Sequence, residues 1–133
     1  MSMIQTVEIS VAQTFGVNVP EGMTLPRYVD GHPLQHLVPR VEAHSFDLDL
    51  LARGMGWLVD EELQANPLLL WGPPGSGKSS FAAQVSARLN RPLIRVDCHA
   101  DMDARDLLGG LRLVDGETVP QPGPTAVAAQ LGA

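Results

Sequence analysis

A run of residues, 72–79, carries the pattern G-x-x-x-x-G-K-S that is typical of a phosphate-binding loop. The glycines at 72, 75 and 77 let the backbone turn tightly and approach phosphate oxygens without a Cβ in the way. Consecutive amides in such a loop form an anion site, and a helix that begins there aims the positive end of its dipole at the same oxygens. The pattern therefore predicts a site for the phosphate chain of a nucleoside triphosphate.

Two side chains in this run would act directly on the phosphates. Lys78 would bridge the β- and γ-phosphates and offset the charge that builds up during transfer, which makes it the predicted catalytic residue. The hydroxyl of Ser79 would be a ligand of Mg²⁺. The prolines stiffen the loop without removing a ladder hydrogen bond. We expect the nucleotide to contact the whole run, which is Gly72, Pro73, Pro74, Gly75, Ser76, Gly77, Lys78, Ser79 and Ser80.

The elements around this run fit its predicted role. Residues 68–71 are apolar in succession, which predicts a short strand buried on both faces, as in a parallel sheet. Residues 78–90 predict a helix with one apolar face, and residues 93–96 predict a second buried strand. Strand, loop, helix and strand in this order form one βαβ unit, which is the context that a phosphate-binding loop requires.

Three further elements are predicted before the phosphate-binding run. Residues 7–11 alternate apolar and polar side chains, which is typical of a half-buried strand. Residues 20–45 are rich in proline and glycine, which favours an irregular, extended segment. Residues 46–65 carry apolar side chains three or four positions apart, which predicts one helix, with Ser45 as its N-cap.

Three elements are also predicted after the βαβ unit. Residues 101–108 favour a short helix. Residues 111–119 predict a β-hairpin, because the Asp-Gly pair at 115–116 is a strong turn signal. Residues 126–131 predict a last helix, with Thr125 as its cap.

Acidic and metal-binding candidates outside the loop have weaker patterns. Residues 57–62 imitate the apolar run ending in Asp-Glu that holds Mg²⁺ in P-loop enzymes, but they precede the loop and have helical spacing, so we interpret them as a solvent-exposed helix end. Asp97 would either cap a predicted strand or orient a metal ion or a substrate hydroxyl. Residues 98–106 lack the spacing of a metal site, and we interpret their aspartates as a solvated helix face. We expect surface or packing roles for the histidines at 32, 36 and 44.

The composition excludes several classes of protein. The 133 residues include 9 basic and 15 acidic ones, and the formal net charge of −6 disfavours a nucleic-acid-binding module. The single cysteine, Cys98, excludes an intramolecular disulfide framework, and we expect it to be a small buried side chain. No apolar run approaches the ~18–20 residues of a membrane span, and no export signal is recognisable. We therefore expect a cytoplasmic globular protein without a membrane partner.

The order of these motifs resembles the AAA+ ATPases of the MoxR and CobS kind, the dynein-related AAA group. The resemblance rests on the phosphate-binding run and on three stretches after it, residues 81–96, 101–109 and 113–117. Within the group the chain looks nearest to the CobS-type subunit of the aerobic cobaltochelatase. That subunit also has a Thr-Phe-Gly followed by a Val-Pro, as at residues 14–16 and 38–39 here.

The resemblance implies an α/β fold: the three-layer αβα sandwich of P-loop NTPases with a parallel sheet, here incomplete. We therefore expect two regions: an N-terminal strand and extended segment at 1–45, and the N-terminal part of an AAA+ P-loop ATPase domain, which begins with the predicted helix, at 46–133. The resemblance also implies that residues 72–79 hold ATP and Mg²⁺. The intact protein would form a homo-oligomeric ring, usually a hexamer. The ring would couple ATP hydrolysis to remodelling of a client protein or to metal insertion, with the hairpin at 111–119 near its pore.

The chain departs from the family after this hairpin. The family continues to a Walker B strand, a sensor asparagine and an arginine finger, none of which can be placed after residue 110, so we expect an N-terminal fragment. Two alternatives stay open, a small P-loop kinase that uses Asp97 as its acid and a nucleotide-binding remnant without catalysis. The kinase is disfavoured because 71 residues precede Gly72, whereas kinases of that class carry the loop near the start of the chain.

The lack of a recognisable base and arginine predicts slow ATP turnover by these 133 residues. Hydrolysis needs a group that orients water, and an arginine supplied to the γ-phosphate is worth roughly 10³–10⁵ in rate. In a phosphate-release assay with Mg²⁺ and ATP, we expect weak nucleotide binding and a rate far below that of an intact ATPase. Turnover at an ordinary enzyme rate would contradict this prediction.

Overall fold

An antiparallel strand pair forms the N-terminal part of the molecule. The computed structural model describes residues 4–131. β1 (Thr6–Ser10) pairs with β2 (Thr24–Tyr28), with Val7 opposite Arg27 and Ile9 opposite Leu25. The strand predicted over residues 7–11 is confirmed except for its last residue, which begins α1 (Val11–Phe15). The helix takes over at that point because the Ser10 side chain accepts a hydrogen bond from an amide of its first turn.

The segment at 20–45 is more regular than its composition predicts. It contains β2 and a 3₁₀ turn, η1 (Gln35–Leu37). Pro26 lies in β2, where it is tolerated because a strand of a two-stranded sheet has a free edge. The sequence prediction of an irregular segment was therefore wrong for these two elements.

The helix predicted over residues 46–65 is divided in the structure. α2 (Leu48–Val59) begins after Asp47, whose carboxylate accepts a hydrogen bond from the amide of Leu50 at 2.9 Å, so Ser45 is not the N-cap. α3 (Glu61–Gln64) begins after Asp60, whose carboxylate accepts from two amides of the next turn. The break at Asp60 has a physical cause, because a carboxylate that binds the following amides starts a new helix.

α4 (Lys78–Arg88) confirms the helix predicted after the loop, and it carries one side of the core. Its inner face packs against α2, where Gly54 allows close approach, since a Cβ there would lie 3.1 Å from the ring of Phe81. Aromatic rings fill the space between the elements, with Phe46 edge-on to Phe15 at 5.1 Å. The buried core consists of Val11, Phe15, Leu25, Phe46, Leu51, Met55, Phe81, Val85 and Leu89.

The two strands predicted on either side of α4 do not form. The strands of the described chain make two separate antiparallel pairs, and residues 68–71 and 93–96 belong to neither. Leu69 and Trp71 are 83% and 93% exposed, although burial on both faces is predicted for them. A parallel strand needs neighbours on its hydrogen-bonding edges, and residues 4–131 place no strand beside either segment.

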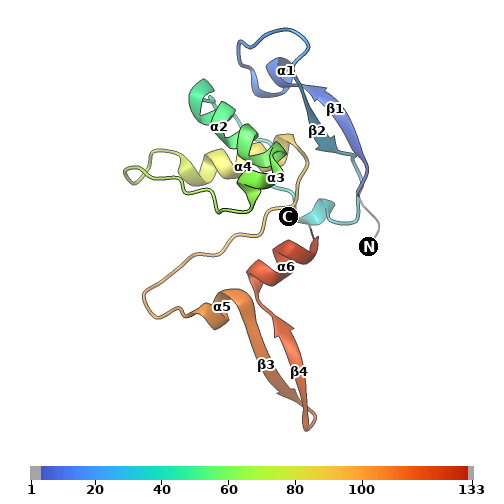
Figure 1. Ribbon diagram of the computed structural model, residues 1–133, viewed down its shortest axis with the longest axis vertical. Helices are drawn as coiled ribbons and strands as arrows, with labels where there is room; N and C mark the ends of the chain where they lie inside the picture. The colour runs from blue at the N-terminus through green and yellow to red at the C-terminus, as the bar shows by residue number, and fades with distance from the viewer. Residues whose placement is uncertain (1–3, 132–133) are drawn as a thin grey trace.

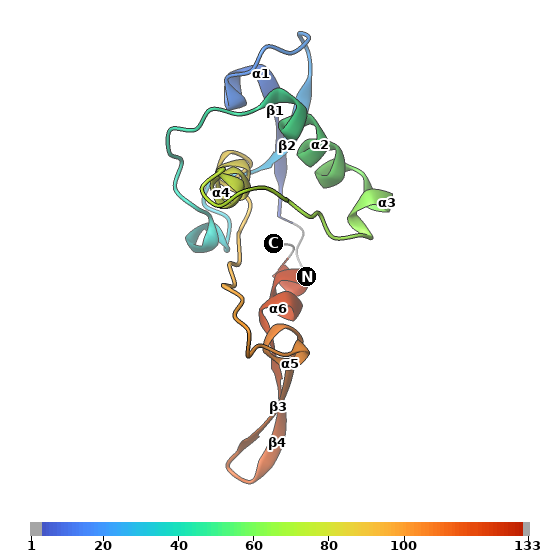
Figure 2. The same ribbon diagram turned by 90° about the vertical axis from the view of Figure 1, so that its left-hand side faces the viewer.

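The C-terminal elements form an arm that projects from the packed body (Figures 1 and 2). α5 (Ala104–Leu108) is followed by a hairpin of β3 (Gly109–Val114) and β4 (Glu117–Pro122), and α6 (Pro124–Leu131) packs near its base. The hairpin turns through residues 115–116, as predicted, with φ of 50° and 85°. Thr125 does not cap α6 but lies inside it, because proline is accepted at the first helical position.

Both predicted regions, 1–45 and 46–133, contribute side chains to the same core. Their outermost residues, 1–3 and 132–133, lie outside the described residues. In the described part of the chain, no helix has the length and apolar character needed to cross a membrane.

Truncation of a core side chain tests the packing of α2 against α4. Leu51 is 2% exposed, so we expect Leu51→Ala to lower the free energy of unfolding by ~2–5 kcal/mol. Leu69→Ala is the matched control, and its effect should stay within about 0.5 kcal/mol because that side chain is exposed. Urea denaturation followed by circular dichroism measures both, and equal effects would contradict the described core.

Glycine substitutions test the backbone at the start of α4. Gly77 is the N-cap of α4 with φ of 86°, a left-handed conformation, so we expect Gly77→Ala to destabilise the protein by ~1–2 kcal/mol. Gly56 lies inside α2 with open space around its Cα, so Gly56→Ala should stabilise by ~0.5–1 kcal/mol. Thermal unfolding should therefore show shifts of opposite sign, and shifts of the same sign would refute this account.

Candidate functional site

The predicted phosphate-binding run is a curved loop that leads directly into α4. Within it the amide of Ser76 donates to the carbonyl of Pro73 at 3.3 Å, which closes a turn. Gly75 lies within this turn and Gly77 directly after it, with φ of 76° and 86°, and such values favour glycine. The glycines at these positions therefore do what the sequence pattern predicts, which is to bend the backbone around a small concave space.

The ammonium group of Lys78 lies inside this bend. Its Nζ donates to the carbonyl oxygens of Gly72 at 2.9 Å and Pro73 at 2.7 Å, and to the hydroxyl of Ser76 at 3.1 Å. The loop carbonyls thus face the ammonium group. This arrangement holds one positive charge at the centre of the loop, and the charge comes from the only lysine of the chain.

The backbone amides at the start of α4 remain available to a ligand. The amide of Phe81 is the first of the helix to find a partner, the carbonyl of Gly77 at 2.8 Å. Within residues 4–131, no protein acceptor binds the amides of Gly75, Gly77, Lys78, Ser79 and Ser80. Unpaired amides at a helix N-terminus, together with the helix dipole, favour an anion. The hydroxyls of Ser79 and Ser80 belong to exposed residues at the same end of the helix.

Two adjoining hollows meet at the loop. The smaller, of about 240 Å³, is lined by Gly75, Gly77, Lys78, Ser79 and Ser80, which are all predicted site residues. The larger, of about 530 Å³, shares Gly77 and Lys78 with it and extends past Gly72, Pro73 and Ser76. Pro74 lines neither hollow.

The wall of the larger hollow was not predicted from the sequence. It is made by Leu50, Arg53 and Gly54 of α2 and by the unpaired residues 68–71. Arg53 pairs with Asp49 at 3.0 Å, and both side chains are exposed. No local pattern predicts that α2 and residues 68–71 share this wall, because they come together only through the packing of α2 beside the loop. Neither hollow is lined by a carboxylate of the described chain, so the only charged groups facing them are Lys78 and Arg53.

The other candidate residues lie apart from this site. Residues 57–62 span the end of α2 and the start of α3, which confirms the interpretation as a helix end. Asp97 pairs with Arg95 at 2.8 Å on the exposed segment that precedes α5. Among the residues described, no group of three or more His, Cys, Asp and Glu could hold a metal ion.

The remaining cysteine and histidine predictions have mixed outcomes. Cys98 is exposed, so the prediction of a buried thiol was wrong, because the strand expected to precede it does not form. Asp103 and Asp106 form a capping box at the start of α5, which gives two of the predicted surface aspartates a structural role. His32 is buried and His36 is exposed, in agreement with the packing and surface roles expected.

Comparison with known proteins identifies the family of this site. Residues 67–133, half of the chain, match the family model described as AAA domain (dynein-related subfamily). This match includes residues 68–71, the whole loop and α4, whereas the α2 residues that line the larger hollow lie before it. No solved structure matches the chain.

Curated relatives point to the same group. Protein NorQ of Paracoccus denitrificans is 47% identical over 85 residues, which are 62% of this chain and 32% of the relative. Protein CbbQ of Hydrogenophilus thermoluteolus is 45% identical over 67 residues, 50% of this chain and 25% of the relative. Gas vesicle ATPase GvpN of Ancylobacter aquaticus is 31% identical over 110 residues, 78% of this chain and 29% of the relative.

These matched regions span about a quarter to a third of the length of the relatives. The family model and the relatives agree on the segment that carries the loop. The chain belongs to the AAA domains of the dynein-related subfamily, the MoxR-like AAA+ ATPases with the α/β fold of P-loop NTPases.

Proposed function

We propose that residues 72–80 bind Mg²⁺-ATP and that the protein acts as an ATPase. The observation that carries this proposal is the position of the Lys78 ammonium inside a loop whose following amides have no protein acceptor. One cation and a set of converging amides at the N-terminus of a helix suit the oxygens of a triphosphate. The family match supports the same chemistry.

Side-chain and backbone groups of the loop would bind different phosphate oxygens. Lys78 would exchange the carbonyls of Gly72 and Pro73 for phosphate oxygens, which are stronger acceptors because they carry charge. The amides of Gly75 and of residues 77–80 would bind further phosphate oxygens in the smaller hollow. The phosphates would thus replace acceptors that the loop itself supplies to Lys78.

The residues present also fit a magnesium ion that arrives with the phosphates. The exposed hydroxyl of Ser79, at the mouth of the smaller hollow, is an oxygen ligand of the kind that Mg²⁺ accepts. Mg²⁺ held by a few protein ligands usually completes its shell with water and phosphate oxygens. When bound, the ion would neutralise charge on the β- and γ-phosphates.

The proposal also covers the assembly and the activity of the intact protein. We propose that the intact protein is a homo-oligomeric ring, a hexamer, that couples ATP hydrolysis to the remodelling of a client protein. The support comes from the family and from the ATPase among the relatives, the one named for gas vesicles. Metal chelation by a CobS-like mechanism, and a cytoplasmic location, stay predictions.

The alternatives have less support. A small P-loop kinase would use Asp97 as its acid, but this carboxylate pairs with Arg95 and lines neither hollow. The family match does not favour a kinase either. A remnant that binds nucleotide without hydrolysis would share the loop geometry and differ only in turnover.

Removal of the Lys78 ammonium tests the proposed site. In the full-length protein, we expect Lys78→Ala to weaken Mg²⁺-ATP binding by about 10–100-fold, because charged hydrogen bonds of ~1.5–3 kcal/mol are lost. Ser79→Ala should reduce the dependence of binding on Mg²⁺ while binding of metal-free ATP persists. Isothermal titration calorimetry measures both.

A control on the same helix separates the site from general damage. Ser86→Ala changes a half-buried hydroxyl of α4 outside the loop, and its binding isotherm should match that of the unaltered protein. Selective ¹⁵N-lysine labelling gives a single side-chain signal, from Lys78, which should shift on addition of Mg²⁺-ATP. An unchanged isotherm for Lys78→Ala would refute the proposed function.

A further inference from the structure

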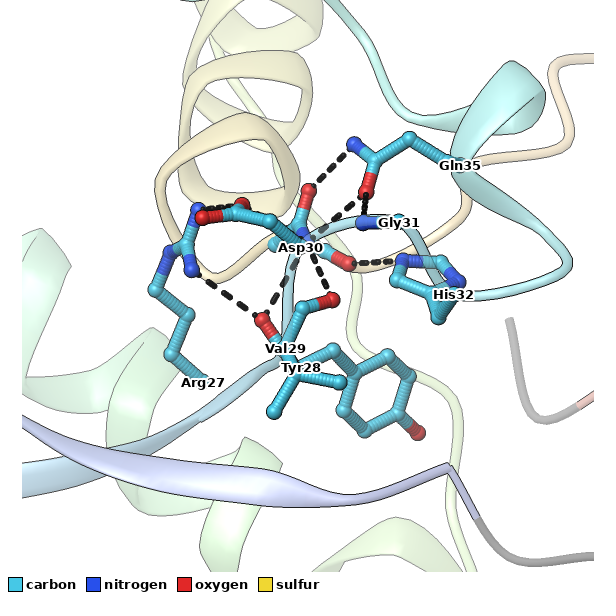
Figure 3. Close-up of polar contacts among 8 residues, drawn as sticks. Arg27, Tyr28, Val29, Asp30, Gly31, His32 and Gln35 are labelled. Carbon is cyan, nitrogen blue, oxygen red and sulfur yellow. Dashed lines mark hydrogen bonds and ion pairs between the residues drawn. The ribbon is translucent and has the colours of Figure 1, made fainter.

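The end of α4 opposite the loop is tied to the N-terminal segment through Asn90. This residue is 2% exposed and has a left-handed φ of 54°. Its Nδ2 donates to the carbonyls of Tyr28 at 3.1 Å and Val29 at 2.9 Å, and its Oδ1 accepts from Nε2 of Gln35 at 2.6 Å. Figure 3 shows the side chains of Gln35 and His32 turned toward the same small region. The contacts join residues more than fifty positions apart in the sequence.

His32 makes two hydrogen bonds in this cluster, and together they determine its protonation. Its Nε2 lies 2.9 Å from the carbonyl oxygen of Asn90, so Nε2 carries a proton and donates it. The amide of Leu34 donates to Nδ1 at 3.2 Å, so Nδ1 is unprotonated and accepts. Only the neutral imidazole with its proton on Nε2 satisfies both bonds. His32 is 5% exposed, so water cannot readily replace either partner.

A second proton would break this arrangement. It would bind Nδ1 and place two donors, the Nδ1–H and the amide of Leu34, against each other. Buried polar groups that lose their partner cost free energy, and a buried charge costs more. The segment from Gly31 to Gln35 would then have to move away from Asn90 to give the imidazolium access to water.

Charged side chains lie near the His32 cluster on two elements. The carboxylate of Asp30 is exposed and paired with Arg27 at 2.6 Å, and this guanidinium lowers the pKa of Asp30. From the α4 side, the guanidinium of Arg91 lies 5.2 Å from the ring centre of Tyr28, which packs edge-on against His32 at 5.7 Å. His36, the nearest other histidine in the sequence, is exposed.

We propose that His32 is a pH-sensitive latch: when neutral it holds residues 31–35 against the end of α4, and when protonated it releases them. Release increases as the pH falls, because the neutral ring alone satisfies both hydrogen bonds of the closed segment. Neutral His32 stabilises the closed segment at higher pH, and this contribution is lost as the pH falls. The latch does not include residues 72–80 and does not depend on the proposed nucleotide site.

Amide hydrogen exchange of the whole chain, measured by NMR, tests the latch. The Leu34 amide depends on Nδ1 of His32, whereas the Tyr28 amide donates to the carbonyl of Leu89 at 3.0 Å and serves as an internal control. Between pH 7.5 and 5.5, we expect the protection factor of the Leu34 amide to fall about tenfold, because release of the segment is coupled to the binding of one proton. The protection factor of the Tyr28 amide should change less than twofold over the same range.

Two variants separate protonation from simple loss of contact. In His32→Asn, the side-chain oxygen can still accept the amide two residues on but does not titrate, so Leu34 protection should no longer depend on pH. In His36→Asn, a histidine is removed from the same segment at an exposed position, and the full tenfold change should persist.

A direct measurement on the unaltered chain keeps the test independent of variant folding. Long-range ¹H–¹⁵N correlation spectra report which imidazole nitrogen carries the proton, and we expect Nε2 for His32 at pH 7.5. A proton on Nδ1 at that pH would overturn the proposal. It would also be overturned if Leu34 protection stayed constant while His32 became protonated.

Discussion

The hydrogen bonds that the Lys78 ammonium donates are the interaction on which the shape of the phosphate-binding loop depends. The loop has no strand ladder on its N-terminal side, because residues 68–71 are unpaired, so its shape rests on its own turn and on this cation. Two carbonyls and a hydroxyl converge on one Nζ. Charge-assisted bonds of this kind contribute ~1.5–3 kcal/mol, more than a neutral bond does. The group proposed to bind phosphate therefore also holds the loop in its curved shape.

α4 connects this loop to the rest of the molecule. Its first turn presents the unpaired amides, its middle supplies Phe81 and Val85 to the core, and its last residues lead into the buried Asn90. One helix thus carries a polar site at each end and an apolar face between them. Because the helix is rigid, packing of α2 and of the N-terminal strand pair against its middle positions both ends.

Features that depend on neighbouring residues could be predicted from the sequence. The loop, α4 and the turn of the hairpin follow from glycine positions, helical spacing and the Asp-Gly pair at 115–116, and the structure has all three. The strands at 68–71 and 93–96 were predicted wrongly because a parallel strand needs partners that are distant in the sequence. The choice of Asp47 over Ser45 as a cap depends on which carboxylate or hydroxyl reaches a free amide, and both residue types are good caps. The Asn90 cluster has no sequence signal, since its members come from two distant segments.

The base of the β3–β4 hairpin is a contact between two backbones. A Cβ on Gly109 would collide with the carbonyl oxygen of Gln121, and one on Gly123 would collide with that of Leu107. The Gly123 amide also donates to the carbonyl of Leu108 at 3.1 Å. The direction of the hairpin is therefore set where α5 and α6 meet it, and its tip at Asp115 is exposed. Insertions or deletions at the tip would change the length of the hairpin but not the direction in which it projects. The length of this segment can therefore vary without any change in the packed core.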